Sequence, residues 1–202
     1  NEGGAKIVLK YYDTQGSPEV GKAETERILQ EGKAKLIIGA YQSSVTKPTS
    51  FVAERQKFPY LCAESSSAAL TERGLKYFFR IAPTDYHDTV MFFQFLNDMK
   101  KEGKKVSKIA MVYEKTEFGF HANEEVKKAV ANSKGAYQVV ADIPYEFKAT
   151  DVNAEVLKVK AAQPDVEFVA EQAPPLGAAA AAGAGPGPGL RARTRDAAAP
   201  GR

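Results

Sequence analysis

Hydroxyl side chains cluster directly after two short apolar runs of this sequence. One cluster lies in GAYQSSVT, residues 39–46, and the other in CAESSSAAL, residues 62–70. Serine hydroxyls both donate and accept hydrogen bonds, and a helix that begins at such a loop presents N–H groups and partial positive charge. Together these groups suit a carboxylate ligand. The same serines could instead serve only as helix caps, so the residue pattern leaves both roles open.

Patterns typical of covalent catalysis and metal binding do not occur in the sequence. The first serine segment lacks the G-x-S-x-G spacing of α/β-hydrolases, and no order of Ser, His and Asp indicates a triad. There is no P-loop and no G-x-G-x-x-G after a strand. The single cysteine, Cys62, is expected to be buried, and His87 and His121 are too far apart for a zinc motif. We therefore expect no enzymatic activity, no cofactor and no metal site.

Strand and helix patterns alternate along the chain, which predicts an α/β fold with parallel sheets. Strands or extended segments are expected at residues 6–12, 34–40, 58–64, 77–83, 107–114, 137–146 and 165–170. Helices are expected at residues 19–32, 46–57, 65–74, 84–103, 118–135 and 149–163. In an open parallel sheet, the loops at the carboxyl ends of the strands form the ligand crevice. Both serine segments are such loops.

Two of the expected helices carry clear local signals. Apolar residues of the helix at 19–32 lie close to one face, as in an amphipathic helix; they are Val20, Ala23, Ile28 and Leu29. Thr84 or Asp85 is the expected N-cap of the helix at 84–103.

Composition limits the range of partners. The 202 residues include 28 basic and 25 acidic side chains, and 44% of the chain is hydrophobic, which indicates a globular protein. The basic residues are scattered, so nucleic acid is not an expected partner. No apolar stretch reaches the ~18–20 residues that span a bilayer.

After Ala170 the composition shifts to Ala, Gly, Pro and Arg. Residues 171–202 are therefore expected to be a disordered, appended or out-of-frame tail, or alternatively a natural linker.

Five motifs in order resemble the substrate-binding proteins of branched-chain amino acid ABC transporters, the Leu/Ile/Val type of type I periplasmic binding protein. They are YDTQGSPE, IIGAYQSSVT, AESSSAALTERG, YFFRIAPTD and KIAMVYEKTEFG, and the resemblance covers about residues 3–170. It implies two three-layer α/β lobes that close on an amino acid or a related small carboxylate or amide. The first lobe would comprise residues 1–82 and the second residues 83–170.

The resemblance also implies a setting for the protein. It would be a monomer that delivers its ligand to a membrane permease, located in the periplasm or lipid-anchored at the cell surface, with no signal peptide in this chain. The family's first strand and helix and most of its second lobe have no counterpart here, so the chain is expected to be a fragment.

The family's ligand-binding positions can be carried over residue by residue. Ser43 falls at the position that binds the ligand carboxylate, with Tyr41 and Ser44 beside it, and Ser66 falls at a head-group position. Glu64 falls where a backbone carbonyl usually accepts from the ligand ammonium.

Two further residues concern the second lobe and the crossover. Phe118 falls where an aromatic of the second lobe covers the ligand. Arg80, near the crossover between the lobes, is expected to pair with a neighbouring carboxylate.

Two alternative functions stay open at this point: a ligand-sensing domain of a receptor or regulator with the same fold, and a flavodoxin-like enzyme or response-regulator domain.

Overall fold

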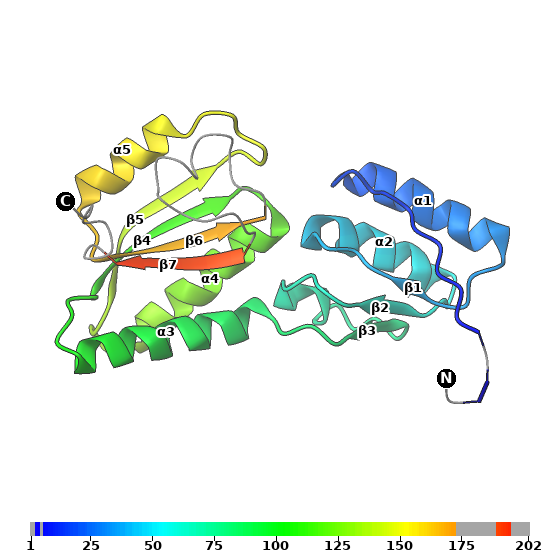
Figure 1. Cartoon of the computed structure of the whole chain (residues 1–202), viewed down its shortest axis with the longest axis horizontal. Helices are drawn as coiled ribbons and strands as arrows, with labels where there is room; N and C mark the ends of the chain where they lie inside the picture. The colour runs from blue at the N-terminus through cyan, green and yellow to red at the C-terminus, as the bar shows by residue number, and fades with distance from the viewer. Residues whose placement is uncertain (1–2, 5, 173–188, 195–202) are drawn as a thin grey trace.

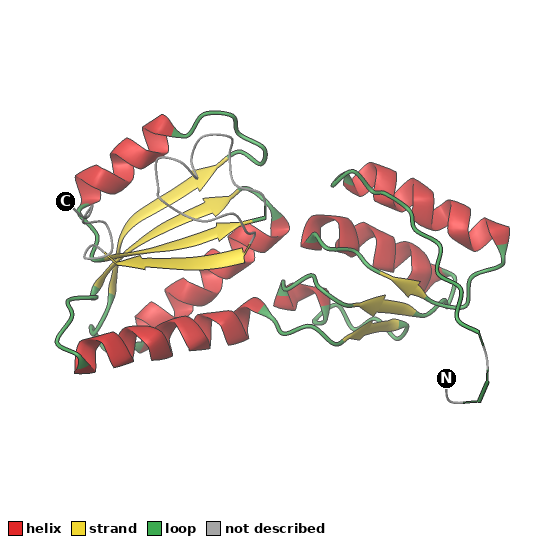
Figure 2. Ribbon diagram, viewed as in Figure 1, coloured by secondary structure: helices red, strands yellow, loops and turns green. Residues whose placement is uncertain are grey.

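Two separate sheets organise the chain, as the computed structural model in Figure 1 shows. The structure describes residues 3–4 and 6–172, and the backbone of residues 189–194. Residues 37–80 contain the strands of a sheet with the order β1-β2-β3, and the strands between residues 108 and 194 form a sheet with the order β5-β4-β6-β7. We call the parts of the chain built around these two sheets the first and the second lobe. Helices and strands alternate in both lobes (Figure 2), which confirms the α/β class.

The first lobe is built from short parallel strands and two longer helices. Its elements are α1 (Pro18–Glu31), β1 (Ile37–Ile38), α2 (Ser43–Arg55), β2 (Tyr60–Cys62), the 3₁₀ helix η1 (Ala68–Leu70) and β3 (Phe78–Arg80). β1 pairs with β2 and β2 with β3, both in parallel. The carboxyl ends of β1 and β2 therefore lie side by side, and the two serine segments leave the sheet at the same edge.

The first sheet is covered on one face and bare on the other. Tyr60 is only 2% exposed, and its hydroxyl lies 2.9 Å from Thr49 Oγ1 of α2, so α2 covers this face. Successive strand residues point to opposite faces. The next residues along β1, β2 and β3 form an aligned row, Ile38, Leu61 and Phe79, in which Ile38 is 55% and Phe79 53% exposed.

Residues 6–12 do not form the expected strand. The structure assigns them to no strand, and the side chains of Ile7, Val8 and Leu9 are exposed. An isolated extended segment gains no ladder hydrogen bonds, and none of the described strands pairs with this one. The β-forming composition of the segment is thus not enough to place it in the sheet.

The second lobe has longer strands and helices on both faces of its sheet. Its elements are α3 (Asp85–Lys101), β4 (Lys108–Glu114), α4 (Glu117–Asn132), β5 (Gln138–Tyr145), α5 (Asn153–Ala162), β6 (Val166–Glu171) and β7 (Gly189–Thr194). Phe92 and Leu96 of α3, with Val126 of α4, pack in one core against β4 and β6. Val159 of α5 packs on the opposite face, so this lobe has three layers.

Part of the tail belongs to the second sheet. Gly189–Thr194 forms β7, which pairs antiparallel with β6, and Glu171 is the last residue of β6, so the expectation of a tail without regular structure is wrong for these residues. The expectation for residues 173–188 and 195–202 lies outside the described residues.

Candidate functional site

Helix α2 begins inside the first serine segment. Gln42 is the N-cap and makes no side-chain capping bond, while Ser43 and Ser44 are the first two helical residues. The alternative that these two serines only cap the helix is therefore wrong, and so is the expectation that the helix starts at residue 46. The backbone N–H groups of a helix's first turn have no intrahelical acceptor. Ser43 and Ser44 thus bring both N–H groups and hydroxyls to the edge of the sheet.

Hydrogen bonds join the two serine segments directly. Ser43 Oγ accepts from the backbone N–H of Ser67 at 3.3 Å. The hydroxyls of Thr46 and Ser65 lie 2.6 Å apart, and Ser65 Oγ donates to the carbonyl of Ala40 at 2.7 Å. All of these side chains are buried except that of Ala40. The neighbouring loops after β1 and β2 therefore form one hydrogen-bonded unit.

The residues at 65–68, which we call the 65–68 loop, are also held from β3. Arg80 donates to the carbonyl of Ser66 at 3.1 Å and to the carbonyl of Ser67 at 2.6 Å. The expected ion pair of Arg80 with a carboxylate is therefore wrong, because its guanidinium binds two backbone carbonyls instead. Burial lowers the pKa of Arg80 below its ordinary value. The charge of Arg80 fixes the shape of the loop.

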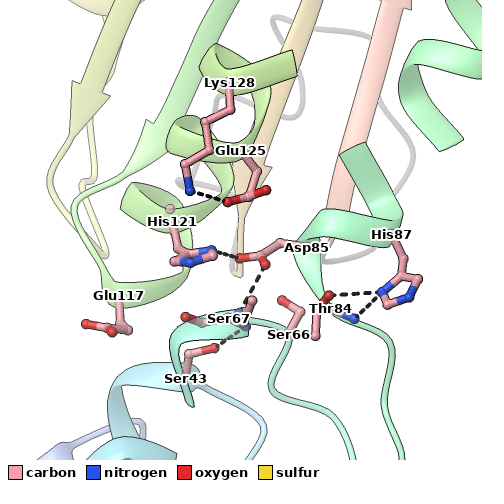
Figure 3. A network of polar contacts seen from close by, with 12 residues as sticks. Ser43, Ser66, Ser67, Thr84, Asp85, His87, Glu117, His121, Glu125 and Lys128 are labelled. Carbon is pink, nitrogen blue, oxygen red and sulfur yellow. Dashed lines mark hydrogen bonds and ion pairs between the residues drawn. The ribbon is translucent and has the colours of Figure 1, made fainter. Parts of the chain in front are cut away.

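Asp85 joins this loop to the second lobe, as Figure 3 shows. Its side chain is fully buried; Oδ1 accepts from the N–H of Ala68 at 3.2 Å, and Oδ2 lies 2.8 Å from Nδ1 of His121 in α4. Thr84, not Asp85, is the N-cap of α3, in a capping box with His87. Burial raises the pKa of Asp85, and the partners His121 and Ala68 partly offset that effect.

An ion pair bridges the two lobes near the same edge. Lys47 Nζ of α2 lies 2.9 Å from both carboxylate oxygens of Glu117, the first residue of α4. Both side chains are partly exposed, so the pair is screened by solvent. It places the beginnings of α2 and α4 opposite each other.

The other sequence-predicted residues of the first lobe surround the joined loops. Tyr41 and Glu64 are exposed, while Ser44 and Ser66 are half-buried. Burial raises the pKa of Tyr41, as do the negative charges of Glu64 and Glu114. Tyr41 therefore lies within electrostatic reach of carboxylates from both lobes.

Phe118 occupies a different environment from the one its predicted role requires. Its side chain is 6% exposed and packs in the core of the second lobe with Ala122 and Phe168. A ring held there fills the space between α4 and the sheet. The structure therefore corrects the expectation that Phe118 is presented to a ligand as a cover.

Sequence reasoning missed several residues of this arrangement. Thr46, Ser65 and Ser67 lie within the two serine segments. They are close to Ser43 because β1 pairs in parallel with β2, which brings the loops after these strands together. The contact between Asp85 and His121 joins residues 36 positions apart, and no local sequence pattern predicts it.

Three further features concern the described part of the chain: a concave surface outside the serine segments, metal-binding clusters and membrane-spanning helices. A concave surface on the first lobe is lined by Lys10, Tyr11, Tyr12, Asp13, Glu24 and Arg27, and it includes no residue of the serine segments. Among residues 3–4, 6–172 and 189–194, no group of three or more His, Cys, Asp or Glu side chains could hold a metal ion. No helix in these same ranges is both long and apolar enough to cross a membrane.

Two bacterial binding proteins are similar to this chain in sequence. The chain is 27% identical over 168 residues to "Leu/Ile/Val-binding protein homolog 3" of Brucella melitensis, covering 82% of this chain and 43% of that protein. It is 27% identical over 177 residues to an "Amino acid binding protein" of Pseudomonas aeruginosa, covering 86% of this chain and 45% of the other. The chain thus spans less than half the length of these curated relatives.

Solved structures share the fold. An ABC-transporter solute-binding protein of R. palustris in complex with benzoate matches with a TM-score of 0.71 at 21% identity, over 83% of this chain and 45% of that one. A substrate-binding protein of Desulfitobacterium hafniense in complex with Leu matches with a TM-score of 0.66 at 19% identity, over 84% and 49%. A family model described as "Periplasmic binding protein" matches residues 1–194. With its α/β lobes and its match over nearly the whole length, the chain belongs to the periplasmic binding protein family.

Proposed function

We propose that the chain is part of a solute-binding protein of an ABC importer, which captures a small carboxylate-bearing ligand between its two lobes. The observation that carries the proposal is the joining of the two serine segments at the carboxyl ends of β1 and β2. Ser43 Oγ accepts from the N–H of Ser67, so the hydrogen of its own hydroxyl is left for another acceptor. This edge of a parallel sheet is where α/β folds bind ligands.

The chemistry of this edge favours a carboxylate. The first-turn N–H groups at Ser43 and Ser44, the hydroxyl of Ser43 and the positive end of the α2 dipole can all interact with one anionic head group. The fold neighbours are described in complex with Leu and with benzoate, two ligands that share a carboxylate. We therefore propose an amino acid or an aromatic carboxylate, with Tyr41, Glu64 and Ser66 around the head group.

Capture involves no covalent step in this proposal. A ligand on the first lobe is enclosed when the second lobe closes over it by hinge motion, and a membrane permease then recognises the closed form. The contact of Lys47 with Glu117 lies where the two lobes meet. The complete binding protein, of which this chain is a part, acts as a monomer in the periplasm or anchored by lipid at the cell surface.

Removing the Ser43 hydroxyl tests the proposal. Calorimetric titration with L-leucine, L-valine, benzoate and 4-hydroxybenzoate, each up to millimolar concentration, is expected to detect binding of at least one of them. Ser43→Ala should weaken that binding by about tenfold or more, because a hydrogen bond to a charged group is lost. Ser133→Ala, which removes a hydroxyl at the end of α4, is the matched control and should leave binding unchanged.

Two results would count against this function. One is the lack of any binding across the panel together with enzymatic turnover of an ester or amide. The other is equal weakening by Ser43→Ala and Ser133→Ala, which would indicate a general loss of stability and not a carboxylate site.

A further inference from the structure

The described chain passes from the first lobe to the second once, through residues 81–84 between β3 and α3. Some contacts between the lobes lie beside this crossover, such as the backbone hydrogen bond from Asp85 to the carbonyl of Ser66 at 3.0 Å. The approach of α2 to α4 lies apart from the crossover in Figure 1. Because a short segment makes the covalent connection in the described chain, the arrangement of the lobes depends on noncovalent contacts away from it.

One face of α4 carries charged side chains that meet the first lobe. Glu117 and Lys128 are three helical turns apart, so they lie on the same face of α4 with about 16 Å between them along the axis. His121 and Glu125 lie between them on this face (Figure 3). Glu125, which pairs with Lys128, raises the pKa of Lys128, and the negative charge of Glu72 in the first lobe adds to this effect.

Two cations of the first lobe act on Glu117. Lys47 Nζ lies 2.9 Å from each of its carboxylate oxygens. Arg73 is held within the first lobe by three hydrogen bonds of 2.9 Å each, to the carbonyls of Leu70 and Lys47 and to the hydroxyl of Ser50. Burial lowers the pKa of Arg73, and the negative charge of Glu117 partly offsets that effect. None of these three hydrogen bonds goes to a carboxylate, so the charge of Arg73 acts on Glu117 across the boundary between the lobes.

The ion pair of Lys47 with Glu117 is not needed to form either helix. Thr116 caps α4 by accepting from the N–H of Gly119 at 3.1 Å, and an acidic residue in the first turn is itself favourable. The side chains of Lys47 and Glu117 are 52% and 25% exposed, so neither requires the other to compensate a buried charge. Their attraction therefore acts on the arrangement of the lobes more than on the folding of α2 or α4.

We propose that this face of α4 is the closure surface of the second lobe, and that the attraction of Glu117 by Lys47 and Arg73 shifts the lobes toward the closed arrangement. The direction follows from the signs of the charges, because opposite charges favour contact and like charges at the same positions favour separation. The inference rests on the proposed function for its effect on ligand affinity. Its effect on the lobes does not require a ligand.

Charge reversal tests the inference on the ligand-free 202-residue chain. Spin labels at Lys22→Cys in α1 and Lys158→Cys in α5, in a Cys62→Ala background, report the distance between the lobes by double electron–electron resonance. Figure 1 shows both labelled helices on the side of the crossover where α2 meets α4, so opening lengthens this distance. Lys47→Glu and Glu117→Lys should each lower the ratio of closed to open molecules about fivefold, because an attraction becomes a repulsion.

A double variant and a matched control complete the comparison. Lys47→Glu combined with Glu117→Lys should move the distance distribution back toward that of the wild type, although incompletely, because Arg73 still favours a carboxylate at position 117. Lys101→Glu reverses a charge in an exposed ion pair within α3 and should leave the distribution unchanged. Raising the salt concentration from about 20 mM to about 500 mM should shift the wild type toward the longer distance.

Three results overturn the inference. One is a wild-type distance distribution that does not depend on salt, which requires no variant to fold. Another is a distribution that both single reversals leave unchanged. The third is a double variant that is more open than either single variant.

Titration with L-leucine and benzoate separates this inference from the proposed function. The ligand that binds should bind the single reversals more weakly by up to the same factor, since apparent affinity scales with the population of the competent arrangement. If neither ligand binds but the distribution responds to charge reversal, the proposed function fails and the closure surface stands. If a ligand binds the wild type and both single reversals equally while the distribution stays unchanged, the inference fails and the proposed function stands.

Discussion

Single polar side chains in this protein take their roles from the partners that the fold brings to them. Ser43 lies in the first turn of α2, yet its hydroxyl accepts from Ser67 in a loop 24 positions later. Arg80 carries a full positive charge, yet it binds two carbonyls and shapes a loop. Asp85 is the extreme case, because its buried carboxylate binds both the N–H of Ala68 and Nδ1 of His121, while its backbone N–H donates to the carbonyl of Ser66.

The titration of Asp85 gives a prediction about stability in acid. Burial raises its pKa above the ordinary value of 3.8, so the folded state holds this proton to higher pH than the unfolded state. The resulting contribution to the free energy of unfolding is fully present below about pH 4 and is lost as the pH rises through the raised pKa. Asp85→Asn removes this contribution. Urea denaturation from pH 3 to pH 7 should show the wild-type stability falling relative to that of Asp85→Asn.

The control for this prediction is another carboxylate of the same helix. Asp98 is exposed and pairs with Lys101 on the surface, so Asp98→Asn should give a curve parallel to that of the wild type. If Asp85→Asn also gave a parallel curve, Asp85 would not titrate differently in the folded and unfolded states.

Helix packing in the first lobe depends on small residues. The buried residues of α1 are Gly21 and Thr25, while Val20, Ile28 and Leu29 are only half-buried and Ala23 is exposed. A Cβ added at Gly21 would lie 2.6 Å from Val45 Cγ1 and 3.1 Å from Thr49 Cγ2 of α2. The two helices therefore approach closely because α1 presents no side chain at this point. The apolar spacing alone indicated a different contact face.

Enlarging Gly21 should separate these helices. Gly21→Ala is expected to reduce the free energy of unfolding by about 1–3 kcal/mol, the usual cost of overpacking, although alanine has the higher helix propensity. Chemical denaturation followed by circular dichroism measures the change. Lys22→Ala, at the adjacent exposed position, should have an effect within about 0.5 kcal/mol. A Gly21→Ala variant as stable as the wild type would mean that α1 and α2 are less closely packed than the 2.6 Å contact to Val45 indicates.

At the scale of the whole molecule, the two lobes differ in how completely their sheets are covered. The second sheet has α3 and α4 on one face and α5 on the other. The first sheet has α2 on one face, and on the other face Ile38 and Phe79 are each more than half exposed. Parallel sheets are normally buried on both faces, so an apolar row of this kind favours association.

Polar substitutions on that bare face should reduce self-association of the chain. The double variant Ile38→Thr with Phe79→Thr keeps β-forming residues, so its free energy of unfolding should change by no more than about 1 kcal/mol. Light scattering after size exclusion, over a range of concentrations, should show less aggregate than in the wild type. Tyr60→Thr, on the covered face of the same sheet, should instead unfold the first lobe. Unchanged aggregation in the double variant would show that this row is not the associating surface.

The sequence by itself determined the alternation of strands and helices, the positions of most elements and the two hydroxyl-rich loops at strand ends. These features are local, because they follow from side-chain periodicity, caps and turn residues within a few positions. Only the tertiary structure decided that residues 6–12 stay out of the sheet, that Gly189–Thr194 joins β6, and that Phe118 is a core residue. It also decided that Arg80 binds carbonyls and that Asp85 meets His121. Strand pairing, burial and contacts over tens of residues depend on which surfaces meet in space, and a single sequence carries no local signal for that.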